Sequence, residues 1–161
     1  MKVKPLALAA LCALTLAACE GGTSGKSEVA SRLDNSRQAS VYPNQTPELN
    51  RLIDRYATFY GVPPDLVHRV VIRESRYQPG ARNGPYYGLM QILPQTARTM
   101  GHRGAPGELL DAETNLKYAV KYLRGAWLVS DGNRDEAVGW YARGYYYEAK
   151  RLGLLEETGL R

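Results

Sequence analysis

The sequence has few of the residues that form disulfides or bind metals. Among its 161 residues are two cysteines, Cys12 and Cys19, and both lie near the start. The rest of the chain therefore offers no disulfide and no thiolate metal site. The two histidines, His68 and His102, are too few and too far apart in the sequence to suggest zinc. We expect no metal site.

The sequence also lacks a long apolar run and a strong charge of one sign. After the first 18 residues, no stretch approaches the ~20 apolar residues that span a membrane. Without Lys2 and Lys4, the 21 Lys and Arg residues fall to 19 against 16 Asp and Glu, a net charge of about +3. That charge is compatible with an anionic polymer, but it is far from the dense basic stripe of a nucleic-acid binder. We expect no nucleic-acid partner.

The first 18 residues have the pattern of a signal peptide: two lysines, an apolar stretch and small residues before Cys19. Residues 16–19, Leu-Ala-Ala-Cys, resemble a bacterial lipobox. The resemblance implies cleavage before Cys19 and a lipid on its thiol, which would anchor the protein to a membrane in the periplasm. Glu20 follows instead of aspartate, which favours the outer over the inner membrane. The alternative is ordinary cleavage, with Cys19 unmodified.

Residues 19–45 are polar and rich in glycine and serine, which predicts a flexible linker. Beyond them, apolar residues recur at helical spacing and no strand is evident. We therefore predict an all-α domain over 46–155, with little or no β-structure, followed by a tail over 156–161. The expected helices cover 47–60, 64–74, 94–100, 112–130, 134–143 and 145–152, with a loop over 102–110.

Tyrosine is the abundant aromatic residue. There are twelve tyrosines against one phenylalanine and two tryptophans. A tyrosine combines an aromatic face with a hydroxyl group, so it suits a wet groove better than a dry core. Tyrosines at the rim of a small core are the alternative explanation.

A single carboxylate, Glu74, ends the apolar helix expected over 64–74. Glu74 follows Val67, Val70 and Val71 at spacings that place it on their face of the helix. A carboxyl group beside apolar side chains loses hydration and holds its proton more tightly. Such a group can act as a general acid near neutral pH. Alternatively, Glu74 only marks a frayed helix end and pairs with a neighbouring arginine.

The loop after Glu74 breaks the helix with glycines and prolines, yet it carries Tyr77, Tyr86 and Tyr87. A plain solvent loop has no need of three aromatic rings. Aromatic faces pack against the C–H faces of sugar rings, so these tyrosines are candidate substrate contacts, Tyr87 in particular. They could instead only attach the loop to the domain.

Three segments identify a family. Residues 74–75 (Glu-Ser), 77–81 (Tyr-Gln-Pro-Gly-Ala) and 88–97 (Gly-Leu-Met-Gln-Ile-Leu-Pro-Gln-Thr-Ala) closely resemble the soluble lytic transglycosylase (SLT) domain of goose-lysozyme-like peptidoglycan enzymes. The resemblance extends over roughly residues 46–147. It implies a lysozyme-like, compact helical domain, and peptidoglycan glycan strands as its partner.

The resemblance also implies roles for individual residues. Glu74 matches the family's sole catalytic acid and base, and Ser75 matches a residue that helps to orient the site. Met90 and Gln91 match positions that line the saccharide groove. Tyr141 matches the tyrosine of the family's Ala-Tyr-Asn-Ala-Gly motif, whose hydroxyl reaches toward the glutamate.

The sequence departs from the family at two places. Ala142 and Arg143 replace the Asn-Ala of that motif, which removes one amide contact. In the loop, Asn83 replaces a serine, Tyr86 and Tyr87 fill a Gly-Ala region, and one residue is missing. These departures affect the expected substrate contacts but not the acid.

A second carboxylate is not evident. Hydrolysing glycosidases usually pair two carboxylates, but Asp65 lies almost three turns before Glu74 and the other acids cannot be placed from sequence. These others are Glu108, Asp111 and Glu136. We therefore expect one glutamate to act first as acid and then as base, in a monomer that needs no cofactor. The alternatives are a hydrolytic muramidase of the same fold and an inactive peptidoglycan-binding scaffold.

Overall fold

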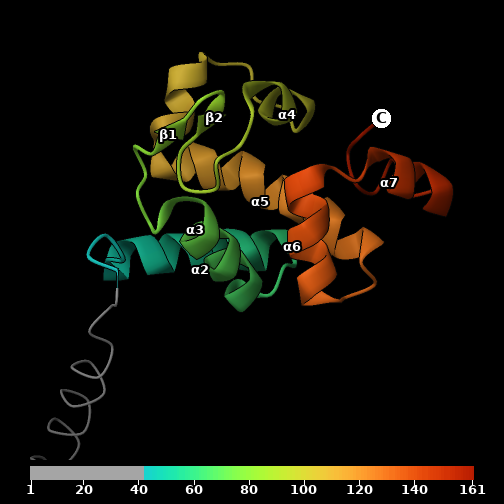
Figure 1. Cartoon of the computed structure of the whole chain (residues 1–161), viewed down its shortest axis with the longest axis horizontal. Helices are drawn as coiled ribbons and strands as arrows, with labels where there is room; N and C mark the ends of the chain where they lie inside the picture. Colours follow the sequence, from blue (N-terminus) through green and yellow to red (C-terminus); the bar gives the residue numbers. More distant parts are fainter. Residues whose placement is uncertain (1–41) are drawn as a thin grey trace, which may run out of the picture. The chain divides into compact units, whose positions relative to one another are not determined.

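The computed structural model of the protein describes residues 42–161, and helices account for most of them (Figure 1). The predictions for the signal peptide 1–18, for Cys19 and for most of the linker 19–45 concern residues outside this described part. In chain order, the elements are α2 (Pro47–Tyr60), α3 (Pro64–Ser75), β1 (Arg82–Asn83), β2 (Tyr86–Tyr87), α4 (Pro94–Thr99), the 3-10 helix η1 (Pro106–Leu110), α5 (Ala112–Val129), α6 (Arg134–Arg143) and α7 (Tyr146–Leu152). The expectation of an all-α domain with little strand is confirmed.

Local signals in the sequence explain where the helices begin and end. The Thr46 hydroxyl accepts a hydrogen bond from the Leu49 N–H, and Gly61 ends α2 with a left-handed φ of 64°. The Asp111 carboxylate caps α5 by accepting from the Thr114 N–H at 2.8 Å. Each cap satisfies backbone groups that have no partner inside their own helix.

Two elements differ from the expectations. A short antiparallel hairpin joins β1 to β2 within the loop after Glu74, with Asn83 opposite Tyr86. Gly84 adopts a φ of 57°, and a two-residue hairpin turn needs such a positive value. The second difference is η1, which lies within the expected loop 102–110 and begins at a proline. Both elements are too short to produce a hydrophobic period in the sequence.

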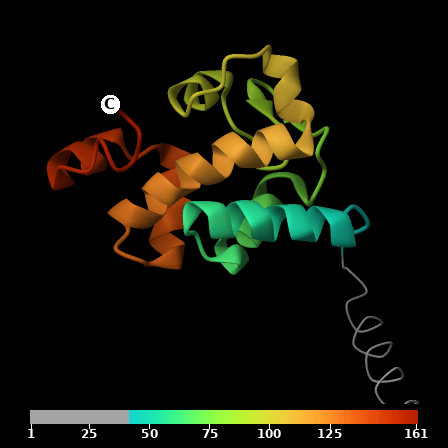
Figure 2. The ribbon, with the colours of Figure 1, turned by 180° about the vertical axis from the view of Figure 1, so that it is seen from behind.

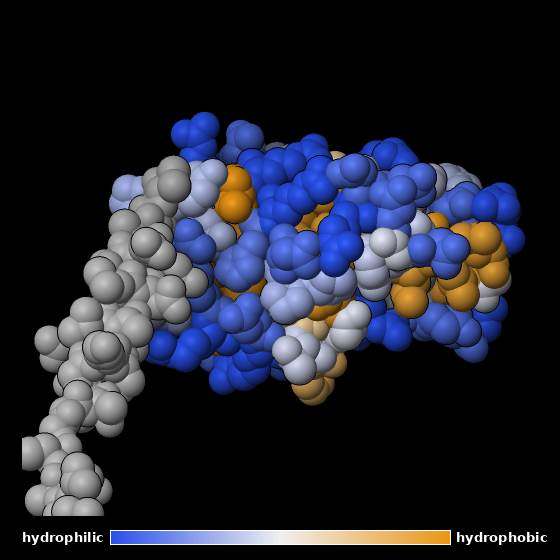
Figure 3. Space-filling model, turned by 90° about the horizontal axis from the view of Figure 1, so that it is seen from below, coloured by the Kyte–Doolittle hydropathy of each residue, from blue (hydrophilic) through white to orange (hydrophobic). Residues whose placement is uncertain are grey.

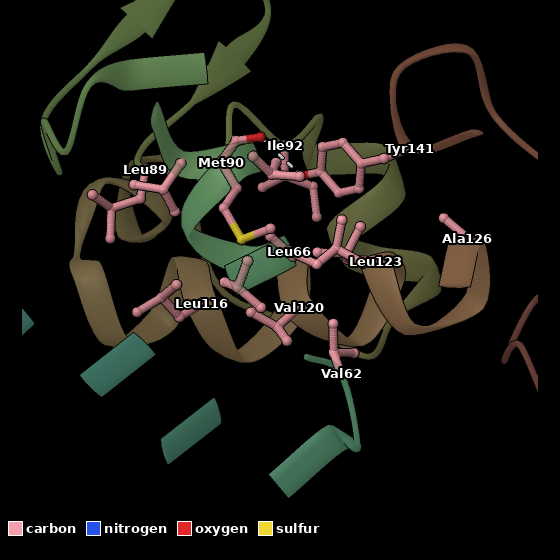
Figure 4. Close-up of a cluster of buried hydrophobic side chains, with 14 of the residues drawn as sticks. Val62, Leu66, Leu89, Met90, Ile92, Leu116, Val120, Leu123, Ala126 and Tyr141 are labelled. Carbon is pink, nitrogen blue, oxygen red and sulfur yellow. Dashed lines mark hydrogen bonds between the residues drawn. The ribbon is translucent and has the colours of Figure 1, made fainter. Parts of the chain in front are cut away.

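Helix α5 lies at the centre of the core. Its inward face buries Leu116, Ala119, Val120 and Leu123 completely. Seen from behind, α2 lies alongside α5 (Figure 2), and Figure 4 shows side chains from α3, α5, α6 and the loop meeting in one apolar cluster. This packing fixes the end of α3 against the middle of the domain.

The C-terminal residues join the same packed unit. In the segment 156–161, which we expected as a tail, Thr158 is 2% exposed and Leu160 packs against the core cluster. The face drawn in Figure 3 is mainly hydrophilic, and hydrophobic residues gather toward the end that carries α7 in Figure 1. Among residues 42–161 there is no helix with the length and apolar character needed to cross a bilayer.

Candidate active site at the end of helix α3

Glu74 lies in the last turn of α3, after the buried valines of that helix. Val67, Val70 and Val71 are completely buried, whereas the Glu74 side chain keeps 23% of its surface exposed. Burial raises the pKa of Glu74 above its ordinary value, and the nearby Arg73 guanidinium opposes this in part. The two groups are 3.5 Å apart, from Arg73 Nε to Glu74 Oε1. The position thus combines partial desolvation with access from solvent, as a general acid requires.

The other acids that the sequence offered as a second carboxylate have structural contacts elsewhere or are exposed to solvent. Asp65 pairs with Arg134 at 2.7 Å, and the Glu108 carboxylate accepts from the Ala105 N–H before η1. Asp111 caps α5, and Glu136 is exposed near the start of α6. Within the described part of the chain, Arg73 is the only charged residue that shifts the pKa of Glu74. Among residues 42–161, therefore, no carboxylate lies close enough to Glu74 to share its proton.

The two histidines have structural contacts. The His68 Nδ1 lies 2.8 Å from the Tyr77 hydroxyl, and its Nε2 lies 3.6 Å from Asp54. The His102 Nε2 lies 3.3 Å from the Ala105 carbonyl oxygen. No group of three or more His, Cys, Asp and Glu residues between 42 and 161 is placed to hold a metal ion.

A tight turn follows Glu74. Ser75 is buried, and its hydroxyl donates to the Val71 carbonyl at 3.3 Å, within its own helix. Arg76 and Tyr77 then take left-handed φ values of 52° and 62°, which are uncommon for residues other than glycine. The Tyr77 ring is 1% exposed, and burial raises the pKa of its hydroxyl to about 12. This buried ring holds the strained turn in place.

Asn115 of α5 holds the loop that contains Tyr87 and Met90. Its Nδ2 donates to the carbonyls of Tyr87 and Leu109 at 2.8 Å each, and its Oδ1 accepts from the Met90 N–H at 3.0 Å. Gly88, with a φ of 73°, passes so close that a Cβ there would collide with Asn115 and with the Leu109 carbonyl. Sequence reasoning missed Asn115, although a signal was present. It lies four residues before Ala119, so it is a polar residue on the apolar face of α5.

Met90 and Gln91 hold the loop in two different ways. The Met90 side chain is completely buried and points into the apolar cluster (Figure 4). The Gln91 side chain donates from Nε2 to the carbonyls of Ala81 and Gly88, at 3.1 and 2.9 Å. Gln91 also lines the groove described below. Of this expected pair, Gln91 is therefore the one whose side chain forms part of the groove wall.

Tyr141 connects the loop to α6. Its hydroxyl donates to the Met90 carbonyl at 2.8 Å, across 51 positions of sequence (Figure 4). Burial raises the pKa of Tyr141 well above its ordinary value, and the Glu74 charge raises it further. The negative charge of Glu74 thus acts on Tyr141, while the Tyr141 hydroxyl donates its hydrogen bond to the backbone of the loop.

A groove of about 360 Å³ lies beside Gln91 and Tyr141. Its volume is near the lower end of the range for small-ligand sites. Glu74 is not part of the groove wall. Tyr141 is part of it, and the charge of Glu74 raises the pKa of Tyr141. Of the tyrosines in the hairpin, Tyr86 lines the groove, whereas the Tyr87 ring is buried beneath the Arg82 guanidinium, 4.5 Å from it. The wall consists of Tyr86, Gln91, Ile92, Leu93, Thr96, Tyr122, Tyr141, Ala142, Arg143 and Gly144.

A larger hollow of about 640 Å³ lies between the beginnings of α2 and α5. It contains none of the predicted site residues. Its charged groups pair with described neighbours, Arg55 with Glu113 and Glu48 with Arg51. We therefore place the candidate active site at Glu74 and the smaller groove.

The relatives found by comparison with known proteins include two transglycosylases of similar identity to this chain. The soluble lytic murein transglycosylase of Escherichia coli K12 is 30% identical over 92 residues, which cover 53% of this chain and 14% of that protein. The peptidoglycan transglycosylase gp16 of phage T7 is 32% identical over 106 residues, which cover 63% of this chain and 8% of gp16. This chain thus spans a small part of either relative. No solved structure gives a significant match.

The family comparison covers more of the chain. The transglycosylase SLT domain matches residues 51–153, well over half of the sequence. The matched range contains Glu74, the turn after it, the loop that Asn115 holds, and Tyr141. The chain belongs to the transglycosylase SLT domain family.

Proposed function

We propose that the protein is a peptidoglycan lytic transglycosylase. It cleaves the β-1,4 bond between N-acetylmuramic acid and N-acetylglucosamine without water and leaves 1,6-anhydro-muramoyl ends. The observation that carries this proposal is the partly desolvated carboxyl group of Glu74, whose pKa is raised and which no second carboxylate among residues 42–161 accompanies. Membership of the SLT family and the two transglycosylase relatives support it.

In the proposed reaction, Glu74 acts twice. Its protonated carboxyl group gives a proton to the glycosidic oxygen as the bond from C1 of the muramoyl residue to that oxygen breaks, and the N-acetylglucosamine side leaves with a hydroxyl group. The resulting carboxylate takes the proton from the muramoyl C6 hydroxyl. The C6 oxygen then bonds to C1 and closes the anhydro ring, so Glu74 ends in the protonated state in which it began.

Tyr141 and the loop give this reaction its geometry. The bond from the Tyr141 hydroxyl to the Met90 carbonyl connects α6 to the loop beside Glu74, and Gln91 ties the same loop internally. Groups fixed in this way keep the acid oriented toward a sugar in the groove. We propose substrate contacts for Tyr86 and Gln91 in the wall, with Ser75 and Met90 as positioning residues.

The structure of the products distinguishes this reaction from hydrolysis. A hydrolytic muramidase would leave a reducing end, whereas the proposed enzyme leaves a product lighter by one water. We expect purified wild-type protein to release anhydro-muropeptides from sacculi, as measured by mass spectrometry. Glu74→Gln should reduce the rate at least 10²–10⁴-fold, the usual contribution of a general acid, with an unchanged circular dichroism spectrum.

Three outcomes would contradict the proposal. Reducing ends would indicate the muramidase, and full activity of Glu74→Gln would exclude Glu74 as the acid. Binding of sacculi without any cleavage by the wild type would indicate a peptidoglycan-binding scaffold.

We further propose that the protein is a lipoprotein of the periplasm, attached through Cys19 to the outer membrane. The lipobox-like residues 16–19 and Glu20 support this. Fractionation of cells that express the wild type or Cys19→Ser tests the proposal. We expect the wild type with the membranes and the variant in the soluble fraction, and equal distribution would contradict the lipid anchor.

A further inference from the structure

Arg143 is the only charged residue in the wall of the groove. It lies in the last turn of α6, two residues after Tyr141, and its side chain is exposed. The other wall residues are aromatic, aliphatic or neutral polar. The position of this one positive charge therefore determines the electrostatic character of the groove.

Two neighbouring residues hold the guanidinium group at this position. Its central carbon lies 3.8 Å from the centroid of the Trp140 ring, within the range of a cation–π contact. Gly139 leaves the space that the group occupies, since a Cβ there would lie 2.5 Å from Nη1 of Arg143. The stacked group loses less side-chain entropy on binding than a freely moving one would.

Arg143 has no acidic partner among residues 42–161. Other arginines on or near α6 do: Arg134 pairs with Asp65, and Arg69 pairs with Asp135. A cation near a helix C-terminus also stabilises that helix, but this role requires neither a tryptophan beneath it nor a position in a groove. The arrangement leaves the donor groups of Arg143 available to a bound molecule.

We infer that Arg143 binds a carboxylate of the substrate and so determines which glycans the groove accepts. The inference rests on the proposed function. A guanidinium matches a carboxylate through two parallel N–H···O bonds. Peptidoglycan offers this group in two places. The lactyl ether of a muramoyl residue is a free carboxylate when no peptide is attached, and the stem peptide carries free carboxylates when it is present.

A binding series tests the inference without turnover. Affinities of Glu74→Gln and of Glu74→Gln with Arg143→Gln are measured by titration calorimetry for three tetrasaccharides. One is a glycan of alternating N-acetylglucosamine and N-acetylmuramic acid without peptide, the second carries stem peptides, and the third is neutral chitotetraose. We expect Arg143→Gln to weaken at least one carboxylate-bearing ligand about tenfold and to leave chitotetraose unchanged, because a hydrogen bond to a charged group is lost.

The pattern of loss identifies the source of the carboxylate. A loss confined to the peptide-free glycan identifies the lactyl group, and a loss confined to the peptide-bearing glycan identifies the stem. Arg143→Lys should retain part of the affinity, since it keeps the charge without the planar fork. Arg98→Gln is the matched control: it removes the same charge from an exposed side chain on α4 that is not in the groove wall.

An equal loss for all three ligands, no loss for any, or no binding of either carboxylate-bearing glycan by Glu74→Gln would overturn the inference. None of these results bears on whether the wild type forms anhydro products. If the wild type instead fails to cleave sacculi, the proposed function fails whatever the binding series shows.

Discussion

The two sides of the groove are held in different ways. The loop side, residues 87–91, reaches the groove wall at Gln91, and it is buried and hydrogen-bonded to Asn115 and Tyr141. The helix side, residues 142–144 at the end of α6, includes the exposed Ala142 and Arg143. The sequences of the two sides differ as well: residues 88–91 of the loop side, Gly-Leu-Met-Gln, resemble the family motif, whereas Ala142 and Arg143 of the helix side depart from it.

This difference has a physical cause. Buried hydrogen bonds hold the backbone of Tyr87 and Met90 and the side chain of Gln91 on the loop side, so removing a partner there leaves buried donors or acceptors unpaired. Ala142 and Arg143 have solvent on one side, and a change there alters only what a bound molecule meets. In the proposed enzyme, the loop side would orient the acid and the helix side would select the substrate.

The largest effect should come from removing the central partner of the loop side. Asn115→Ala leaves the Met90 N–H and the Leu109 carbonyl without their partner in a buried place. The Tyr87 carbonyl loses one of its two donors and keeps the Ile92 N–H. Each unpaired group costs about 1–3 kcal/mol, so we expect the free energy of unfolding to fall by about 2–6 kcal/mol, and cleavage to fall with it. Denaturant unfolding and the sacculus digest measure the two effects.

Tyr141→Phe should have a smaller effect of the same kind. It removes one hydrogen bond, to the Met90 carbonyl, and keeps the ring. Its loss should be about 1–3 kcal/mol, smaller than that of Asn115→Ala. If Asn115→Ala were as stable as the wild type, or less damaging than Tyr141→Phe, the loop side would not depend on Asn115 and the contrast between the two sides would fail.

The sequence predicted the features that depend on near neighbours. The helix boundaries at Thr46, Gly61 and Asp111 follow from residues within one turn of each boundary. The partial burial of Glu74 follows from its spacing to the valines of α3. These predictions succeed because helix periodicity and capping act over four residues or fewer.

The contacts of the site depend on residues far apart in the chain, and the sequence did not predict them. Asn115 reaches the Met90 backbone across 25 positions, and Tyr141 reaches it across 51. Their partners are backbone atoms, which every residue carries, so no residue type marks them. Tyr86 lines the groove and Tyr87 is buried because adjacent side chains of a strand in the hairpin point to opposite faces.

Glu74 is partly buried, and this burial should have a small, pH-dependent cost in stability. The folded protein holds the Glu74 proton more tightly than the unfolded chain does, because burial raises its pKa. The stability that Glu74 contributes is therefore complete below the ordinary glutamate pKa of about 4.3 and is lost as the pH rises through the higher, folded-state pKa. Glutamine stays neutral throughout. We expect Glu74→Gln to be more stable than the wild type at neutral pH, with the difference shrinking below about pH 4.

The free energy of unfolding of both proteins, measured between about pH 4 and pH 8, tests this sign. Glu48→Gln provides a control of opposite sign. A backbone hydrogen bond at the start of α2 and the Arg51 side chain lower the pKa of Glu48, so its contribution is present at neutral pH and is lost on acidification. A Glu74→Gln variant that is equal to or less stable than the wild type at neutral pH would mean that Glu74 ionises as readily as in water. The same result would remove the physical reason for assigning it the role of the acid.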